Sequence, residues 1–418
     1  MLHRPSNLYK KARDRLRSAR RVVVFGGMAT LLAACSLPMT AAADSAMPVD
    51  YHAWNSGHDF YKGDFDGTRV KWRHGEAVLT LRKGETSGTW VSNAYKTPVP
   101  MSKIVPSWQA ETPDGTWIQT DLSVKVDDEW SDWFVMGKWT LGDTIQRATV
   151  AGQENDFGAV YQDTYFANDD KPATEYRLRA QLHGDGEHRP RISQLAVTAS
   201  SPAAVSNTAS ETTMHRTVDL DVPKFSQYDH EGEYPQYDAG GEAWCNPTST
   251  AMIIAYYGEG PTQEQIDALP ADPVFDANGR EDGEVDYAAI HTFDFGNGDT
   301  GNWPFQTAYA ASYGLDASVR QANSLRKLES HIKRGIPLVI STAWDNTDSD
   351  PNNDLTGSYI PETAGHLMVV RGFTEDGDVI ANDPASADDA SVRRVYQRAE
   401  FERNWLNVSD GTYYLIRH

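Results

Sequence analysis

The segment GGEAWCNPTSTAMIIAYYG, residues 240–258, decides the expected fold of the second half of the chain. Asn246 is a good N-cap, Pro247 suits a first helical turn, and the apolar run that follows ends at a glycine. The pattern predicts a buried helix over residues 247–257, with Cys245 at its N-terminal end. Unpaired backbone N–H groups and the positive end of the helix dipole favour a thiolate there, the form of cysteine that attacks carbonyl carbon.

The number of cysteines makes this position informative. The sequence has two, Cys35 and Cys245, and Cys35 lies in a segment with the features of a targeting signal. Cys245 is therefore expected to be an unpaired thiol. A buried cysteine that fills space as a small apolar side chain is the alternative. Such a residue has no need of a helix N-terminus, so we interpret Cys245 as a nucleophile.

A thiol nucleophile needs a base, and the best candidate lies far downstream. The segment AGHLMVVRGF, residues 364–373, places His366 at the head of an apolar strand. A second apolar strand, residues 379–381, leads to Asp383. The two strands predict an antiparallel hairpin that returns a carboxylate to the imidazole, and neither of the rival histidines, His291 and His230, begins such a hairpin.

The spacing within this hairpin constrains its turn. A tight turn at Asp376-Gly377 would place Asp383 opposite Val370, about 13 Å along the strand from His366 at about 3.3 Å per residue. We therefore predict a longer or bulged turn, centred nearer residues 374–375.

Taken together, the motifs FSQ (225–227), WCNPTS (244–249), GHLMVV (365–370) and NDP (382–384) resemble the bacterial double-glycine-leader peptidase-like group, family thirty-nine of the cysteine peptidases. The resemblance covers roughly residues 216–418 and is closest to stand-alone secreted actinobacterial members. It implies an α+β papain-like domain without a cofactor. The roles that it implies are nucleophile for Cys245, base for His366, orienting carboxylate for Asp383 and oxyanion donor for Gln227.

Other residues near the motifs are candidates for binding the substrate. A tetrahedral oxyanion needs fixed N–H donors, and the amide of Gln227 with the backbone N–H of Cys245 could supply two. The long polar gap between these residues leaves Gln236 as a second candidate. Trp244 and Trp303 are the expected substrate-binding aromatic residues, with core packing as the alternative for Trp303.

The N-terminal half predicts a different kind of domain. Short alternating stretches between Gly, Asp and Pro turns, over residues 48–200, favour an all-β sandwich. Its eight tryptophans either fill the core or form a carbohydrate-binding or cell-wall-binding surface; they are Trp54, Trp72, Trp90, Trp108, Trp117, Trp130, Trp133 and Trp139. Residues 201–215, rich in Ser, Thr and Ala, are the expected linker to the domain at 216–418.

The first 43 residues are typical of a secretory signal peptide. Eight Lys and Arg residues precede the apolar run 22–34, which is too short for a membrane span, and Ala41-Ala42-Ala43 offers a cleavage site. Leu32-Ala33-Ala34-Cys35 also resembles a lipobox, which would tether the protein to the membrane through a lipid on Cys35. We expect the protein to be secreted or held at the cell surface.

Charge and composition narrow the partners. The formal net charge of -21 makes nucleic acid an unsuitable partner, because phosphate binding needs a basic surface. The oxygen-rich run 345–354 lacks the Gly and Glu of an EF-hand register, so we predict a solvated loop and no metal. The prediction is a cysteine peptidase acting on peptides or proteins, including cell-wall peptides. The alternative is a catalytically silent surface protein that binds peptide or glycan.

Overall fold

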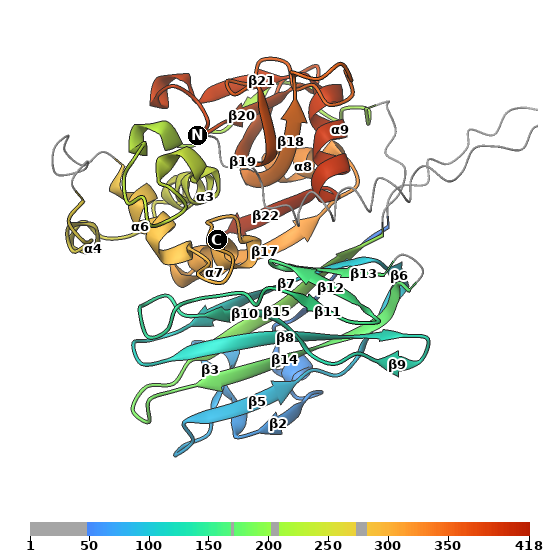
Figure 1. Cartoon of the computed structure of the whole chain (residues 1–418), viewed down its shortest axis with the longest axis vertical. Helices are drawn as coiled ribbons and strands as arrows, with labels where there is room; N and C mark the ends of the chain where they lie inside the picture. The colour runs from blue at the N-terminus through green and yellow to red at the C-terminus, as the bar shows by residue number, and fades with distance from the viewer. Residues whose placement is uncertain (1–47, 169–170, 202–208, 273–281) are drawn as a thin grey trace, which may run out of the picture.

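The computed structural model describes residues 48–168, 171–201, 209–272 and 282–418 of the chain. Two bodies are visible in Figure 1: one built almost entirely of strands, and one in which helices pack around a further sheet. The expected signal peptide, residues 1–43 with Cys35, and part of the expected linker lie outside the described residues. None of the helices in the described ranges is long and apolar enough to cross a bilayer.

The N-terminal domain consists of two antiparallel sheets. In the first, the strand order is β11-β12-β13-β7-β15-β4-β3 with β1 paired to β15; in the second it is β10-β8-β14-β5-β2, with β6 on β14 and β9 on β8. The elements are β1 (Val49–Trp54), α2 (Gly57–Phe60), β2 (Asp64–Asp66), β3 (Thr68–Arg73), β4 (Glu76–Leu81), β5 (Ser87–Val91), β6 (Tyr95–Met101), β7 (Lys103–Glu111), β8 (Trp117–Val126), β9 (Glu129–Trp130), β10 (Phe134–Trp139), β11 (Gln153–Glu154), β12 (Gly158–Tyr161), β13 (Thr164–Ala167), β14 (Ala173–His183) and β15 (Arg191–Ser200). The expected β-rich domain is present.

Alternation along the strands explains why these segments form sheets with one buried face. Along β14 buried residues regularly follow partly exposed ones, the period-two pattern of a strand that covers a core. Tryptophans fill that core: Trp54, Trp90, Trp108 and Trp139 are buried. Trp72, by contrast, is 61% exposed. Core filling therefore accounts for half of the eight tryptophans.

The C-terminal domain is a seven-stranded antiparallel sheet with helices around it. Its strand order is β17-β22-β18-β19-β20-β21, and β16 pairs with β19. The elements are β16 (Val218–Asp219), η1 (Gln227–His230), η2 (Gly241–Ala243), α3 (Cys245–Tyr256), α4 (Gln263–Asp267), α6 (Gly283–Thr292), α7 (Trp303–Ser312), β17 (Asp316–Gln321), α8 (Leu325–Ile332), β18 (Leu338–Asp345), β19 (Glu362–Phe373), β20 (Val379–Asn382), η3 (Asp389–Ser391), β21 (Arg393–Tyr396), α9 (Arg398–Ser409) and β22 (Thr412–Arg417).

The start of α3 differs from the expectation. The helix begins at Cys245 and its N-cap is Trp244, whereas the sequence pattern favoured Asn246 as the cap. Asn246 is instead fully buried, and its side chain bonds to the carbonyl of Thr300 and to the hydroxyl of Tyr414. Tertiary hydrogen bonds thus take the side chain that a local cap would have used.

The hairpin that carries the candidate base and carboxylate was predicted correctly in kind. A bulge interrupts the pairing of β19 with β20 between Val370 and Gly372. The turn itself, however, is centred on Asp376, because Phe373 pairs with Val379. The expected shift of the turn toward residues 374–375 was therefore wrong, and the bulge changes the register instead.

The two domains share one apolar core and direct hydrogen bonds. The ring of Phe305 on α7 lies 6.1 Å from Trp108 and 5.4 Å from Trp139 of the N-terminal domain, centroid to centroid. The described end of the expected linker is also held down. The N–H of Ser210 donates to Glu402 at 2.6 Å, and the hydroxyl of Thr212 donates to Glu329 at 2.7 Å.

Candidate active site

Helix α3 places the thiol of Cys245 beside the sheet. Cys245 is a free cysteine, partly exposed, at the first residue of the helix. The hydroxyl of Ser249, one turn later, donates to the carbonyl of Leu367 on β19 at 3.2 Å. This bond ties the start of α3 to the strand that carries His366, so the two elements hold a fixed relation.

His366 lies between the thiol and a carboxylate. Its Nε2 is 2.7 Å from Oδ1 of Asp383, and both side chains are buried. The thiol of Cys245 lies close enough to the ring to be one of the groups that raise its pKa. Since Nε2 is engaged by Asp383, Nδ1 is the nitrogen that remains for the thiol. Cys245 at the start of α3, His366 on β19 and Asp383 just after β20 are thus brought together.

Asp383 is itself held from two further sides. Oδ1 accepts the backbone N–H of Ala385 at 3.0 Å, and Oδ2 accepts the hydroxyl of Tyr396 at 2.6 Å. Trp344 on β18 presents its ring edge-on to His366, with centroids 5.2 Å apart. These contacts fix the rotamers of the carboxylate and the imidazole. Sequence reasoning missed Tyr396 and Trp344, because neither belongs to a motif.

The surroundings set the charge state of the imidazole. Burial disfavours the charged ring, but the charge and hydrogen bond of Asp383, together with those of Cys245, raise the pKa of His366 to about 10. The arrangement therefore favours an imidazolium beside Cys245. A positively charged group next to the sulfur is what a cysteine nucleophile requires at neutral pH.

Gln227 lies in the η1 turn next to the segment that precedes Cys245. Its side chain is buried, and Nε2 donates to the carbonyl of Glu242 at 2.8 Å. An amide nitrogen carries two hydrogens, so this bond leaves one N–H. The other candidate, Gln236, is solvent-exposed. The geometry favours Gln227 over Gln236 as a donor.

The two tryptophans expected to bind substrate do not offer their rings to solvent. Trp244 is fully buried and its indole N–H donates to the carbonyl of Tyr237 at 2.7 Å. Trp303 is 7% exposed and its ring lies under the ammonium group of Lys103, from the N-terminal domain. Both are packing residues, because neighbouring segments take the surface that a ligand would need.

A half-buried aromatic residue near the site was not anticipated. Burial, then the charges of Asp383 and Cys245, raise the pKa of Tyr228. The ring of Tyr228 is 6.1 Å from that of Tyr359, which is 50% exposed. Arg394 lies 5.7 Å from the Tyr359 ring centroid. The two tyrosine rings and the guanidinium of Arg394 form one cluster, which we call the aromatic rim.

The rival histidines are engaged elsewhere. Nδ1 of His291 is 2.8 Å from the carbonyl of Tyr287, and burial lowers the pKa of its ring to about 4. Nδ1 of His230 lies between Oε2 of Glu233 at 2.9 Å and Oδ1 of Asp286 at 3.0 Å. His366 is thus the histidine that meets both the thiol and a returning carboxylate.

The group His230, Glu233 and Asp286 has residue types that bind metal ions. Within the described ranges it is the one set of three or more such side chains close enough to share an ion, and all three are buried. These contacts are explained by ion pairs between the imidazole and the two carboxylates. Burial alone would lower the pKa of His230, but hydrogen bonds and charges from both carboxylates raise it to about 10. We interpret the group as an ionic clamp between η1 and α6.

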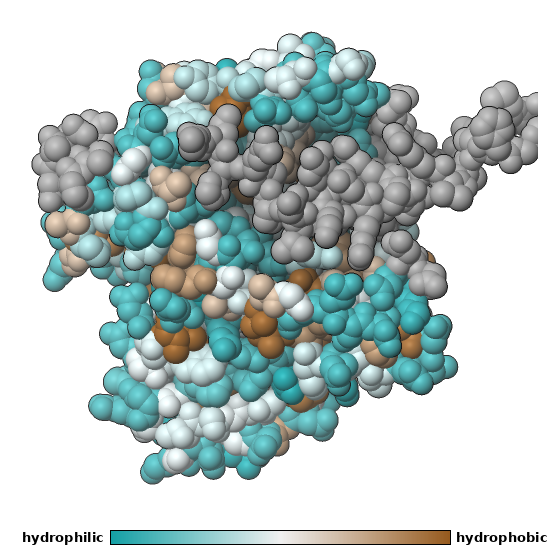
Figure 2. Space-filling model, viewed as in Figure 1, coloured by the Kyte–Doolittle hydropathy of each residue, from teal (hydrophilic) through white to brown (hydrophobic). Residues whose placement is uncertain are grey.

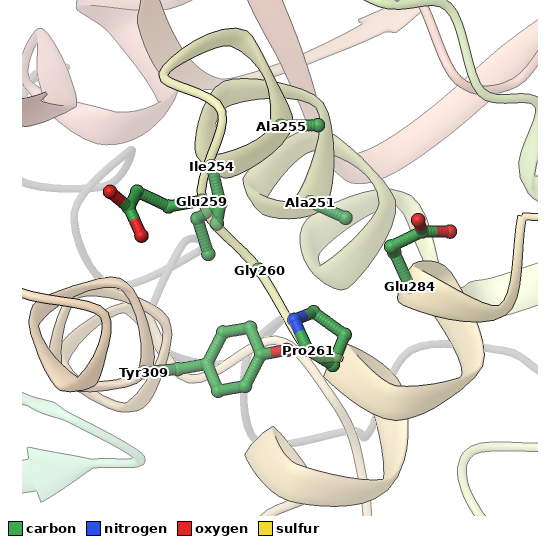
Figure 3. Close-up of a pocket in the computed structure, with 8 residues that line it drawn as sticks. All are labelled: Ala251, Ile254, Ala255, Glu259, Gly260, Pro261, Glu284 and Tyr309. Carbon is green, nitrogen blue, oxygen red and sulfur yellow. The ribbon is translucent and has the colours of Figure 1, made fainter. Parts of the chain in front are cut away.

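Hydrophilic side chains dominate the face of the molecule shown in Figure 2, and hydrophobic ones form small separate patches on it. Figure 3 shows a pocket where α3 and α7 approach the Gly260-Pro261 segment. Its lining residues are Ala251, Ile254, Ala255, Glu259, Gly260, Pro261, Glu284 and Tyr309, and none is a candidate catalytic residue.

Comparison with known families agrees with this division into domains. Residues 50–200 match the family described as the Peptidase C39 N-terminal domain, and residues 219–413 match the Peptidase_C39 like family. Both domains thus match models of C39-type peptidase families. The first match ends where β15 ends, and the second begins within β16, so the family match and the fold place the domains alike. No curated relative matches the chain.

Solved structures resemble this C39-like chain only distantly. A candidate C39-like peptidase from Bacillus anthracis is 17% identical over 49% of this chain and 98% of its own, with a TM-score of 0.28. A family two carbohydrate esterase from Cellvibrio japonicus is 13% identical over 39% of this chain and 38% of its own, with a TM-score of 0.20. At these TM-scores the likeness supports no conclusion about fold or activity.

Proposed function

We propose that this protein is an exported cysteine peptidase, with a papain-like catalytic domain, that hydrolyses peptide bonds through Cys245. The observation that carries the proposal is the position of His366, which contacts Asp383 at 2.7 Å and lies near enough to Cys245 for the thiol to raise its pKa. A nucleophile, a base and a group that orients the base are the minimum for covalent catalysis by a thiol. The match to the C39-like family supports the same reaction class.

The first half of the reaction forms an acyl-enzyme. The Cys245 thiolate attacks the carbonyl carbon of the scissile bond, a C–S bond forms, and the carbonyl electrons move onto oxygen. When the tetrahedral intermediate collapses, the C–N bond breaks and Nδ1 of His366 gives its proton to the leaving amine. Asp383 keeps Nε2 protonated and the ring in one orientation throughout.

The second half releases the acid product. Nδ1 of His366, now neutral, takes a proton from water as the water oxygen attacks the thioester carbonyl. The C–S bond breaks, the carboxylic acid leaves, and the thiolate and imidazolium pair is restored. The reaction consumes one water molecule and needs no cofactor.

Two features of the site match what the intermediate and the substrate require. The remaining N–H of the Gln227 amide and the backbone N–H of Cys245 would stabilise the oxyanion. The aromatic rim of Tyr228, Tyr359 and Arg394 would give an extended peptide apolar surface and a hydrogen-bonding edge. We assign substrate contact to this rim in place of Trp244 and Trp303.

Alkylation of the thiol tests the catalytic pair directly. Iodoacetamide should modify Cys245 rapidly at about pH 6 in the wild type and at least about tenfold more slowly in His366→Ala, because a neutral thiol is a poor nucleophile. His291→Ala, at a half-buried histidine that contacts the carbonyl of Tyr287, is the matched control and should keep the wild-type rate. Equal rates in wild type and His366→Ala would contradict the proposal and favour a surface-binding protein.

Peptide cleavage tests the reaction itself. Wild-type protein incubated with a mixed peptide library should produce new N-termini that mass spectrometry detects. Cys245→Ala should produce none under the same conditions. An alkylation-competent protein that cleaves no peptide bond in the library would overturn the assignment as a peptidase while leaving the reactive thiol in place.

Export is a separate part of the proposal. It rests on the basic and apolar segments and the alanines that end at residue 43, which lie outside the described residues. Expression in a bacterial host, followed by fractionation and mass analysis of the mature N-terminus, tests it. Release of Cys35→Ser but not of wild type from the membrane fraction would show lipidation, whereas retention of the intact precursor in the cytoplasm would exclude export.

A further inference from the structure

The loop between α6 and α7, residues 293–302, is bound on one side by the N-terminal domain. Asp294 accepts the backbone N–H of Thr149 at 2.9 Å and its hydroxyl at 2.6 Å. Farther along, the amide of Gln162 donates to Asp299 at 2.7 Å, and Asp163 accepts the N–H of Trp303 at 2.6 Å. Three residues of the β-domain therefore hold a loop of the catalytic domain at both ends and in the middle.

The carboxylate of Asp294 also forms hydrogen bonds within the loop. Asp294 accepts the N–H of Gly296 at 2.9 Å and the side-chain amide of Asn302 at 3.0 Å, while its own N–H donates to the carbonyl of Asp299. The loop fits closely against the β-domain, because a Cβ on Gly296 would lie 2.0 Å from the carbonyl oxygen of Thr149. Asp294 is fully buried, so these charge-assisted bonds act away from water, where each is strongest.

On its other side the loop contacts the segment that carries the nucleophile. The carbonyl of Thr300 accepts the side-chain amide of Asn246, next to Cys245, at 3.2 Å. The hydroxyl of Thr300 lies 3.4 Å from the carbonyl of Ala243, two residues before Cys245, and 3.1 Å from a carboxylate oxygen of Asp238. The residues on both sides of the cysteine are thus tied to the loop.

We propose that the N-terminal domain positions the nucleophile: Thr149, Gln162 and Asp163 fix the 293–302 loop, and the loop, through Thr300, fixes the start of α3. This inference rests on the proposed function, since it concerns the reactivity of Cys245 toward electrophiles. Thr149, Gln162 and Asp163 act as positioning residues, distant from the reacting atoms. On this view the β-domain contributes to the reactivity of Cys245, whatever surface it also offers to a partner.

The chain offers a set of matched variants at one position. Thr149→Val removes the hydroxyl that donates to Asp294 and keeps the shape of the side chain, and Asp294 keeps its bonds from the Thr149 N–H and Asn302. Thr149→Ser restores the hydroxyl. Thr68→Val removes an equally buried hydroxyl of the N-terminal domain that bonds within its own domain, to the carbonyl of Thr89 at 2.8 Å.

The test is the rate of iodoacetamide alkylation of Cys245 in the full chain, from about pH 5 to about pH 9. Thr149→Val should react about 3- to 10-fold more slowly than wild type at about pH 6, the change expected from loss of one hydrogen bond. Thr149→Ser should recover most of the rate. Thr68→Val should keep the wild-type rate and pH profile even where its melting temperature falls.

Two outcomes overturn the inference. One is a wild-type rate in Thr149→Val; the other is an equal loss of rate in Thr149→Val and Thr68→Val, which would mark general destabilisation. Failure of the proposed function looks different, because alkylation of the wild type would then be independent of His366.

Discussion

At the scale of single residues, the site is defined by what surrounds one carboxylate. Asp383 accepts hydrogen bonds from His366, Tyr396 and the backbone of Ala385. These hydrogen bonds satisfy the oxygens of a buried carboxylate, which would otherwise carry a desolvation penalty. Burial and the charge of Asp383 raise the pKa of Tyr396, so its hydroxyl remains a donor.

Replacing Asp383 by Asn should separate its charge from its shape. Asp383→Asn keeps the volume but removes the charge, so the pKa of His366 should fall toward its ordinary value and the thiolate should lose its counter-ion. We expect alkylation of Cys245 at about pH 6 to slow by about tenfold or more. Asp376→Asn, at the exposed turn of the same hairpin, is the control. An unchanged pH profile in Asp383→Asn would show that its charge does not govern the imidazole.

A second buried histidine predicts how stability depends on pH. Burial lowers the pKa of His230, but hydrogen bonds and charges from Asp286 and Glu233 outweigh this effect and raise the pKa from 6.5 to about 10. The folded protein keeps this proton above about pH 6.5, where the unfolded chain releases it. The stabilisation is therefore complete below about pH 6.5 and is lost as pH rises through about 10.

His230→Gln should therefore cost most at low pH. Urea unfolding at about pH 6 should show a loss of about 3 kcal/mol or more, because two buried carboxylates lose their cation. The difference in unfolding free energy between wild type and variant should narrow toward about pH 10. The pKa of His366 is raised as well, so the unfolding free energy of His230→Gln should still depend on pH, but less steeply than that of the wild type. A constant gap across this range would mean that the ring of His230 is neutral.

At the scale of elements, the sequence placed the main pieces and missed their exact fit. The helix after Cys245, the strand after His366 and the return to Asp383 follow from local patterns of caps, apolar runs and turns. The register does not, because the bulge at Arg371 leaves Val369 opposite Asn382, so Asp383 lies beyond the last paired residue. A bulge depends on contacts across the sheet, and no local motif encodes it.

The residues that the sequence failed to assign share the same cause. Tyr396 reaches Asp383 because β21 pairs with β20, and Trp344 reaches His366 because β18 pairs with β19. Trp244 looked like a substrate contact beside the nucleophile, but the η1 and η2 turns bury it. Only a folded sheet and its packed turns bring such residues together, so pattern alone could not have ranked them.

The contact between the η1 and η2 turns gives the element-scale prediction. A Cβ on Gly241 would lie 2.3 Å from the carbonyl oxygen of Gln227 and 2.4 Å from the carbonyl carbon of His230. Backbone atoms cannot yield as a flexible side chain can, so Gly241→Ala should push the turn that holds Gln227 away from Cys245. We expect a loss of about 1–3 kcal/mol in stability, typical of overpacking, and slower peptide cleavage.

Gly365→Ala is the control for that change, since a Cβ there meets nothing within 4 Å although it adjoins His366. It should keep both stability and cleavage near wild type. Normal cleavage by Gly241→Ala would indicate that the Gln227 turn has no part in the reaction.

At the scale of the whole molecule, the chain has two domains that share one apolar cluster, while a second cluster lies within the catalytic domain. A single cluster of buried apolar residues includes Trp108 and Trp139 from the β-domain and Phe305 and Tyr309 from the catalytic domain. The two expected domains are visible, yet they are not independent in packing. Alternation and turn signals reveal where sheets form, but not which outer faces meet, because an interdomain face and an internal core have the same apolar composition.

Phe305 is the residue that should reveal this coupling. It is fully buried and packs against both interdomain tryptophans. If the domains unfold as one unit, calorimetry of the wild type should give a single transition. Phe305→Ala should cost about 3–5 kcal/mol and, because the loss falls on the shared interface, split or broaden that transition.

Phe60→Ala removes an equally buried ring that packs on Trp90 inside the β-domain. It should lower the melting temperature of the single transition without splitting it. Two resolved transitions in the wild type, with Phe305→Ala shifting neither, would show that the domains fold separately. The interface would then be too weak to carry the positioning of Cys245 from the β-domain, so the calorimetry bears on the chemistry as well as on the fold.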